Sequence, residues 1–210
     1  MQPFFQIISC AILILYGTTI VGDAAEEKHI STMVVAGGCF WCIEADFDRV
    51  EGVISTTSGY TGGHVGNPTY KNVTAGGSGH FEAVSIKFDS AKVSYTQLLK
   101  VFWRVIDPTD IDGQFCDRGK SYRTAIFTNT PEQNRLAKNS KEKLGKAGIL
   151  KSPIVTIIKK LDTFYRAEEY HQDYYKKNPF RYSIYRFNCG RDRRIKELWG
   201  GEFQINTENR

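Results

Sequence analysis

The segment 39–42, Cys-Phe-Trp-Cys, places two thiols three positions apart directly after two glycines. The residues before it are typical of a buried strand, and those after it show the spacing of a helix. A thiol at the start of a helix faces unpaired backbone N–H groups and the positive end of the helix dipole. Both favour the thiolate, which is the nucleophilic form of cysteine. We therefore expect Cys39 to act as a nucleophile.

This cysteine pair has three chemical interpretations. It could be a thioredoxin-like dithiol, or half of a zinc site completed by Cys116 and Cys189. Zinc sites usually use two closely spaced pairs, whereas Cys116 and Cys189 are each isolated in the sequence. In the third interpretation Cys39 is a nucleophile and Cys42 a resolving thiol. Positions i and i+3 share one helix face, at a separation compatible with a disulfide.

Glu82 is the second residue with a chemical signature. The alternating segment 81–88 predicts a strand in which Glu82 shares a face with Val84, Ile86 and Phe88. A carboxyl held in an apolar environment keeps its proton to higher pH and can serve as a general acid. We interpret Glu82 as a proton donor, with a strand-end carboxylate that reaches solvent as the alternative.

Two long loops carry further polar groups. Residues 59–80 contain 7 of the 19 glycines, and residues 107–121 form a second loop rich in Gly and Asp. Long loops inside compact domains are usually functional. Tyr60 opens the first loop, and Asp117 and Tyr122 lie in or just after the second. Tyrosine hydroxyls can donate hydrogen bonds to a polarised oxygen without carrying charge.

The elements that must position these residues alternate irregularly. The sequence predicts strands at 32–36, 53–58, 81–88, 124–128 and 154–158, and a short helix at 166–175. A helix follows the first strand, and two others start at capping signals, Ser94 with Gln97 and Thr130 before Pro131. This order predicts a single α+β or α/β sandwich.

Composition excludes several classes of protein. The chain has 210 residues, 41% hydrophobic and 24% charged, which excludes a disordered chain or a membrane protein with many spans. The net charge of +5 arises in residues 151–210, which hold 13 Lys/Arg against 8 Asp/Glu. We interpret this basic segment as a solvated face, with nucleic-acid binding as the alternative.

The N-terminus has a different character. Residues 4–22 are uncharged and mostly apolar, and Gly22 and Ala24 fit the small-x-small rule for cleavage after Ala24. We expect residues 1–24 to be a signal peptide, or an uncleaved anchor, before a domain at 25–210. Cys10 lies inside this segment, so four of the five cysteines remain after cleavage. The expected location is a bacterial periplasm.

The sequence resembles the A-type peptide methionine sulfoxide reductases. Five blocks occur in the order typical of the family over residues 33–200, and they make the match specific. The blocks are 38–41 (GCFW), 59–63 (GYTGG), 79–84 (GHFEAV), 117–123 (DRG with YR), and 170–172 (YHQ) followed by Asn178-Pro179.

The resemblance implies a two-layer α/β sandwich with a mixed sheet and a ferredoxin-like core. It also implies the reaction. The Cys39 thiolate attacks the sulfur of methionine (S)-sulfoxide, free or in a protein, and Glu82 protonates the departing oxygen. The remaining implied roles are hydroxyl assistance from Tyr60 and Tyr122, an apolar pocket for the methyl group from Phe40 and Trp41, and a polar wall from Asp117.

The resemblance further implies that Cys39 becomes a sulfenic acid, which a second cysteine converts to a disulfide. Thioredoxin or a similar dithiol then reduces this disulfide, without a metal or organic cofactor. Many family members place the resolving cysteine soon after the Asn-Pro pair, where this chain has Ser183. Cys42 and Cys189 are equally favoured candidates, and Cys116 is third. We expect a monomer that repairs oxidised proteins and binds no nucleic acid.

Overall fold

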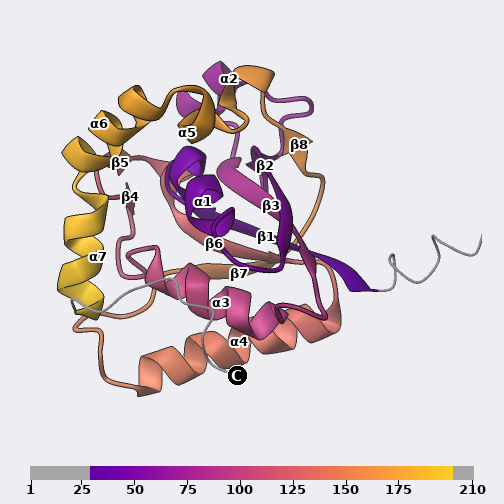
Figure 1. The fold of residues 1–210 in the computed structure, drawn as a ribbon, viewed down its shortest axis with the longest axis vertical. Helices are drawn as coiled ribbons and strands as arrows, with labels where there is room; N and C mark the ends of the chain where they lie inside the picture. The colour runs from indigo at the N-terminus through magenta and orange to yellow at the C-terminus, as the bar shows by residue number, and fades with distance from the viewer. Residues whose placement is uncertain (1–28, 201–210) are drawn as a thin grey trace, which may run out of the picture.

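The computed structural model describes residues 29–200 as one α+β domain (Figure 1). The predicted signal peptide therefore lies outside the described residues. Among those described, no helix has the length and apolar character needed to cross a bilayer.

A six-stranded mixed sheet forms the centre of the domain. Its strand order is β7-β6-β1-β3-β2-β8, with β6 and β7 parallel and every other neighbouring pair antiparallel. The predicted mixed sheet is thus confirmed. The strands are β1 (Ile30–Gly37), β2 (Val53–Thr61), β3 (Phe81–Asp89), β6 (Thr124–Thr128), β7 (Ile157–Lys160) and β8 (Tyr165–Arg166); a separate hairpin pairs β4 (Gly113–Gln114) with β5 (Asp117–Arg118).

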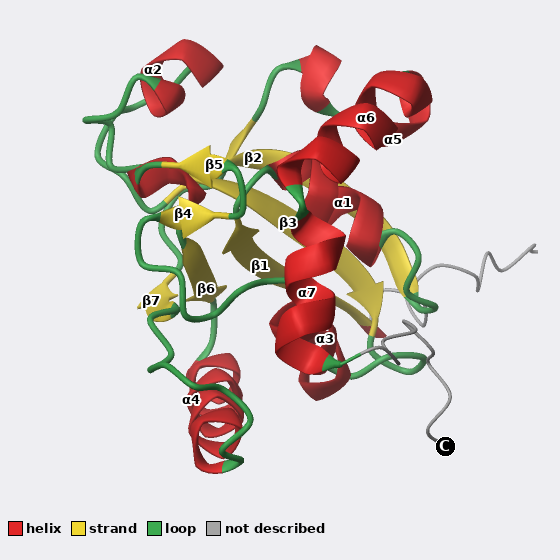
Figure 2. Ribbon diagram, turned by 90° about the vertical axis from the view of Figure 1, so that its left-hand side faces the viewer, coloured by secondary structure: helices red, strands yellow, loops and turns green. Residues whose placement is uncertain are grey.

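Helices cover one face of this sheet. Alternate residues of the central strands, such as Met33, Val84 and Ile126, form the main core together with side chains of helices α1 (Phe40–Phe47) and α3 (Tyr95–Arg104). The opposite face holds a smaller cluster that includes Val34 and Phe127, against which residues of the segment between β7 and β8 pack. The helix layer is visible beside the strands in Figure 2. The predicted two-layer arrangement is therefore confirmed.

Local capping explains where several helices begin. Ser94 and Gln97 form the expected capping box, and the Thr130 side chain accepts the backbone N–H of Gln133. The helices are α1 (Phe40–Phe47), α2 (Tyr70–Thr74), α3 (Tyr95–Arg104), α4 (Pro131–Lys146), α5 (Tyr174–Lys177), α6 (Pro179–Cys189) and α7 (Arg191–Trp199).

The loop segments contain more structure than their sequence indicates. Strand β2 continues to Thr61, so Tyr60 lies in a strand, and the loop after it contains α2. The segment 107–121 contains the β4–β5 hairpin. The predicted helix at 166–175 is wrong: a 3₁₀ turn at Glu169–His171 and helix α5 replace it. Asp173, with φ of 51°, separates the two, because a left-handed residue interrupts a helix.

The basic C-terminal segment is only partly a solvated face. Arg191 is 1% exposed and donates hydrogen bonds to the carbonyl oxygens of Gly37 and Val105. Arg186 donates to the buried Asp46 carboxylate at 2.8 Å. The interpretation of this segment as solvent-facing was therefore wrong for these two arginines, which hold α6 and α7 against the domain.

Candidate active site

The junction between β1 and α1 positions Cys39. Gly38 has φ of +83°, and a Cβ at this residue would lie 2.6 Å from Cβ of Gln114, so only glycine fits this turn. The turn makes Cys39 the residue immediately before α1, and its side chain is buried, with 5% exposed. The predicted position of the thiol at a helix start is therefore confirmed.

Glu82 reaches this junction from β3. Its side chain is 1% exposed, and its Oε2 accepts the backbone N–H of Phe40 at 3.1 Å. Burial raises the pKa of Glu82 to about 8, and the negative charge of Asp117 adds to this rise. At neutral pH Glu82 is therefore mostly protonated, which is the form that a proton donor requires.

The Cys39 thiol has a raised pKa rather than the lowered one expected from its place at a helix start. Burial raises the pKa well above its usual value. The neighbouring Cys42 raises it further, as do Asp117 and, above its own pKa, Glu82 when these carboxyls are ionised. The effects of burial and of the nearby carboxylates on the pKa of Cys39 are therefore larger than the opposite effect of the helix dipole. Near neutral pH both the Cys39 thiol and Glu82 are therefore protonated.

Cys42 is the nearest thiol to Cys39. The two side chains lie close enough to shift each other's pKa, and both cysteines are free thiols within the described part of the chain. Cys42 is 1% exposed and packs with Ala45 and Tyr182. The neighbouring Cys39 lowers the pKa of Cys42, and the charge of Arg191 contributes to the same shift.

Two tyrosine hydroxyls meet beside Glu82. The Tyr122 hydroxyl lies close enough to the Glu82 carboxyl and to the Tyr70 hydroxyl to shift their pKa values. Burial raises the pKa of Tyr70 to about 12 and also raises the pKa of Tyr122. Both phenols therefore stay neutral at neutral pH and can donate hydrogen bonds. Sequence reasoning missed Tyr70. The residue that could have indicated its position is Thr69, which caps a helix. The Thr69 side chain accepts the backbone N–H of Asn72, and helix α2 therefore begins at Tyr70.

Tyr60 lies near this group but its hydroxyl points to another partner. Tyr60 and Glu82 are paired residues of β2 and β3. The Tyr60 hydroxyl donates to Oε2 of Glu168 at 2.8 Å, and Oε1 of Glu168 accepts the backbone N–H of Tyr70 at 2.8 Å. Tyr60 therefore supports the start of α2, whereas Tyr70 and Tyr122 surround Glu82.

The aromatic residues after Cys39 lie in different surroundings. Phe40 is 1% exposed and packs against His171 at 4.9 Å between ring centroids. Trp41 is partly buried and stacks on Tyr174 at 3.7 Å, while its indole N–H donates to Nδ1 of His171 at 3.1 Å. Burial lowers the pKa of His171 to about 4, so its ring is neutral and can accept this bond. Sequence reasoning missed the contribution of His171.

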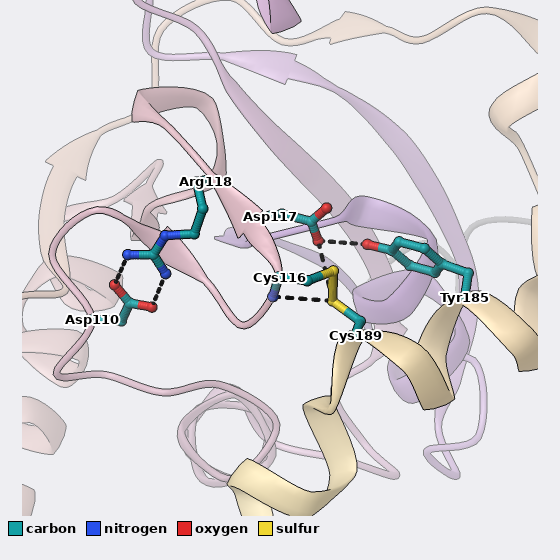
Figure 3. Close-up of a disulfide and its surroundings, with 6 residues drawn as sticks. All are labelled: Asp110, Cys116, Asp117, Arg118, Tyr185 and Cys189. Atoms are coloured by element: carbon teal, nitrogen blue, oxygen red, sulfur yellow. Dashed lines mark hydrogen bonds and ion pairs between the residues drawn. A yellow bond between two sulfur atoms is a disulfide. The ribbon is translucent and has the colours of Figure 1, made fainter.

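A disulfide between Cys116 and Cys189 lies beside Asp117 (Figure 3). The Cα atoms of the two cysteines are 4.8 Å apart, and the Asp117 Oδ2 atom is 3.9 Å from Sγ of Cys189. Cys116, Asp117 and Cys189 are also the one group of potential metal ligands found in residues 29–200, but two of them share this bond. Cys189, a candidate resolving thiol, is thus already paired.

The structure therefore gathers Cys39, Cys42, Glu82 and Tyr122 at one junction, with Asp117 at its edge. A buried thiol beside a protonated carboxyl and a second thiol is suited to redox chemistry at sulfur. Fold and site together define a thiol-dependent oxidoreductase.

Comparisons with known proteins identify the family. Residues 31–202 match the family model of the peptide methionine sulfoxide reductases. The MsrA of Bacillus licheniformis is 52% identical over 176 residues, which cover 84% of this chain and 96% of that protein. MsrA 2 of Caulobacter vibrioides is 48% identical over 93% of this chain and 97% of its own length. The chain belongs to the peptide methionine sulfoxide reductase family.

Solved structures agree with this assignment. The reduced form of Mxr1 from Saccharomyces cerevisiae matches with a TM-score of 0.69 and 27% identity, covering 78% of this chain and 92% of that one. Methionine sulfoxide reductase A of Corynebacterium diphtheriae matches with a TM-score of 0.65 and 31% identity, covering 77% and 81%. The fold is thus the fold of this family of oxidoreductases.

Proposed function

We propose that this protein reduces methionine (S)-sulfoxide, free or in proteins, with Cys39 as the nucleophile. The observation that carries the proposal is the buried Cys39 thiol beside Glu82, whose pKa of about 8 keeps it protonated. Family membership supplies the substrate class. The test is formation of methionine from the (S)-sulfoxide, with no turnover of the (R)-sulfoxide.

In the first step Glu82 gives its proton to the sulfoxide oxygen while Sγ of Cys39 attacks the substrate sulfur. The sulfur–oxygen bond of the substrate breaks, and the oxygen ends on Cys39 as a sulfenic acid. Methionine sulfur is reduced, the cysteine sulfur is oxidised, and the thiol proton replaces the proton that Glu82 donated. The hydroxyls of Tyr70 and Tyr122 donate hydrogen bonds to the polarised oxygen, because neither phenol is ionised at neutral pH.

In the second step Cys42 acts as the resolving thiol. Its sulfur attacks the sulfenic acid, a water molecule leaves, and a Cys39–Cys42 disulfide forms. Two observations support Cys42 over Cys189. Cys42 lies in the first turn of α1, close enough to Cys39 to shift its pKa, and Cys189 is bonded to Cys116.

We expect one turnover without reductant to yield a Cys39–Cys42 disulfide and leave Cys116–Cys189 intact. The measurement is mass mapping of disulfide-linked peptides. A Cys42→Ser variant is expected to release one methionine per enzyme at the wild-type rate and then to recycle with thioredoxin at least tenfold more slowly. The matched control, a double Cys116→Ser/Cys189→Ser variant, should still form the Cys39–Cys42 bond. Recovery of a Cys39–Cys189 peptide would contradict this assignment.

The proposed reductant is thioredoxin or a similar dithiol. A disulfide between Cys39 and Cys42 returns to two thiols only when an external dithiol supplies two electrons. A crystal structure of the yeast protein Mxr1 contains Trx2 as its partner. Because one chain carries every residue of the proposed site, the protein is expected to act as a monomer.

The proposed location is a bacterial periplasm, reached through cleavage after Ala24. The apolar segment 4–22 and its small residues motivate this proposal. The reductant there would be a thioredoxin-like donor that receives its electrons across the membrane. Cell fractionation and N-terminal sequencing are expected to find a chain that begins at Ala25 in the periplasmic fraction. Full-length protein confined to the cytosol would contradict this.

A further inference from the structure

Helix α6 holds the β4–β5 hairpin at two adjacent points. Tyr185 and Cys189 are four positions apart on α6, so their side chains lie on one face of the helix. The Tyr185 hydroxyl donates to Oδ2 of Asp117 at 2.5 Å, and Cys189 is bonded to Cys116. Figure 3 shows the two attachments side by side. One is a hydrogen bond and the other is covalent, and they engage consecutive residues of the hairpin.

Arg118 anchors the opposite side of the same hairpin. Its guanidinium forms hydrogen bonds to both carboxylate oxygens of Asp110. Neighbouring residues of a strand point to opposite sides, so Arg118 points away from α6 while Asp117 points toward it (Figure 3). The backbone at Asp117 is therefore fixed from both sides, and the direction of its carboxylate depends on Tyr185.

We propose that Tyr185 is a positioning residue that holds the Asp117 carboxylate at the edge of the active site, with the Cys116–Cys189 disulfide keeping α6 in place for this contact. The proposal rests on the proposed function, in which Glu82 donates a proton near Asp117. Tyr185 itself lies at the site, because its ring contacts Trp41 edge-on at 5.7 Å between centroids.

The charge of Asp117 gives this contact a chemical consequence. Burial raises the pKa of Asp117, while the hydrogen bond from Tyr185 and the positive charge of Arg191 oppose the rise. Asp117 in turn contributes to the raised pKa of Glu82. Tyr185 therefore helps Asp117 stay ionised, and the charge of Asp117 helps Glu82 stay protonated. Acid catalysis needs two carboxyls whose pKa values differ in this way. The titratable or charged groups facing Asp117 are Tyr185 on α6, Arg191 on α7, Cys39 before α1, Tyr70 on α2, Glu82 on β3 and Tyr122.

The test is Tyr185→Phe, which removes a single hydroxyl. We expect the single-turnover rate of sulfoxide reduction to fall about tenfold, with KM changed less than threefold, since a hydrogen bond to a charged group is lost. The alkaline limb of the pH–rate profile should move to lower pH, because a less ionised Asp117 no longer raises the pKa of Glu82. The matched control is Tyr175→Phe, which removes a hydroxyl that donates to the Asp48 carboxylate at 2.8 Å, outside the site. Its rate and pH profile should equal those of the wild type.

One further measurement separates this proposal from the function on which it rests. In a crystal structure of the Tyr185→Phe variant, the Asp117 carboxylate is expected to rotate away from its wild-type position. This readout does not require activity, so it tests the positioning role even if the wild-type protein reduces no sulfoxide. A variant with Asp117 in place, a wild-type rate and an unchanged pH profile would overturn the proposal.

The disulfide is tested by the double Cys116→Ser/Cys189→Ser variant. We expect its single-turnover rate to lie between those of the wild type and Tyr185→Phe, with thioredoxin-dependent recycling retained. If this variant completes the first turnover at the wild-type rate but cannot be recycled, the disulfide serves electron transfer and its role in holding α6 is overturned.

Discussion

Replacing Cys39 by serine is expected to lower the rate of methionine formation by at least about 10³-fold, because a hydroxyl is a far weaker nucleophile toward sulfur than a thiol. Serine also fails to form the sulfenic acid and disulfide on which the reaction depends. The measurement is methionine released from methionine (S)-sulfoxide with dithiothreitol as reductant. The side chain is buried at the start of α1, and serine is smaller than cysteine, so the variant is expected to fold.

The control for this prediction is the same substitution at the neighbouring thiol. Cys42→Ser introduces an identical chemical change one helical turn away and should complete a first turnover at the wild-type rate. If Cys39→Ser reduced the substrate as fast as the wild type, the assignment of Cys39 as nucleophile would be wrong. Loss of the first turnover in both variants would show instead that the two thiols act as one unit.

Replacing Glu82 by glutamine is expected to lower the rate by roughly 10²–10⁴-fold, the usual contribution of a general acid. The amide is close in shape to the carboxyl and can still accept the Phe40 N–H, but it has no acidic proton to donate. A wild-type rate for this variant would contradict the role of Glu82 and favour a simple dithiol oxidoreductase, which needs no such acid.

The pH dependence follows from the same residue. Burial raises the pKa of Glu82 to about 8, so the active, protonated form is present below that pH and is lost as pH rises through it. We expect the rate of the first turnover to fall on the alkaline side with a midpoint near pH 8. In the glutamine variant this limb should disappear, because the titrating group has been removed.

Glu44 offers a matched control for this experiment. It is also a buried carboxyl, 1% exposed, whose pKa burial raises to about 7, but it lies further along α1 than Phe40 and faces Asp173. Glu44→Gln should therefore keep both the rate and the alkaline limb of the wild type. Loss of the alkaline limb in this variant would show that Glu44, and not Glu82, is the carboxyl that titrates.

The local sequence alone determined where the nucleophile and the acid lie. Two glycines between a strand and a helix place Cys39 at a helix start, because few other residues fit such a turn. The period-two pattern of the strand placed Glu82 on an apolar face shared with Val84, Ile86 and Phe88, and Glu82 is indeed buried. These features depend on neighbouring residues, so they can be predicted from a short segment.

Only the tertiary structure decided the protonation of the site and its partners. The raised pKa of Cys39 comes from burial and from the charges of Glu82 and Asp117, which the local pattern at a helix start does not contain. The pairing of Cys116 with Cys189 joins residues 73 positions apart, and four cysteines allow three pairings that sequence cannot separate. Tyr70 rather than Tyr60 lies beside Tyr122, because Glu168, distant in sequence, binds the Tyr60 hydroxyl. Such contacts depend on how distant segments pack, and local patterns carry no information about them.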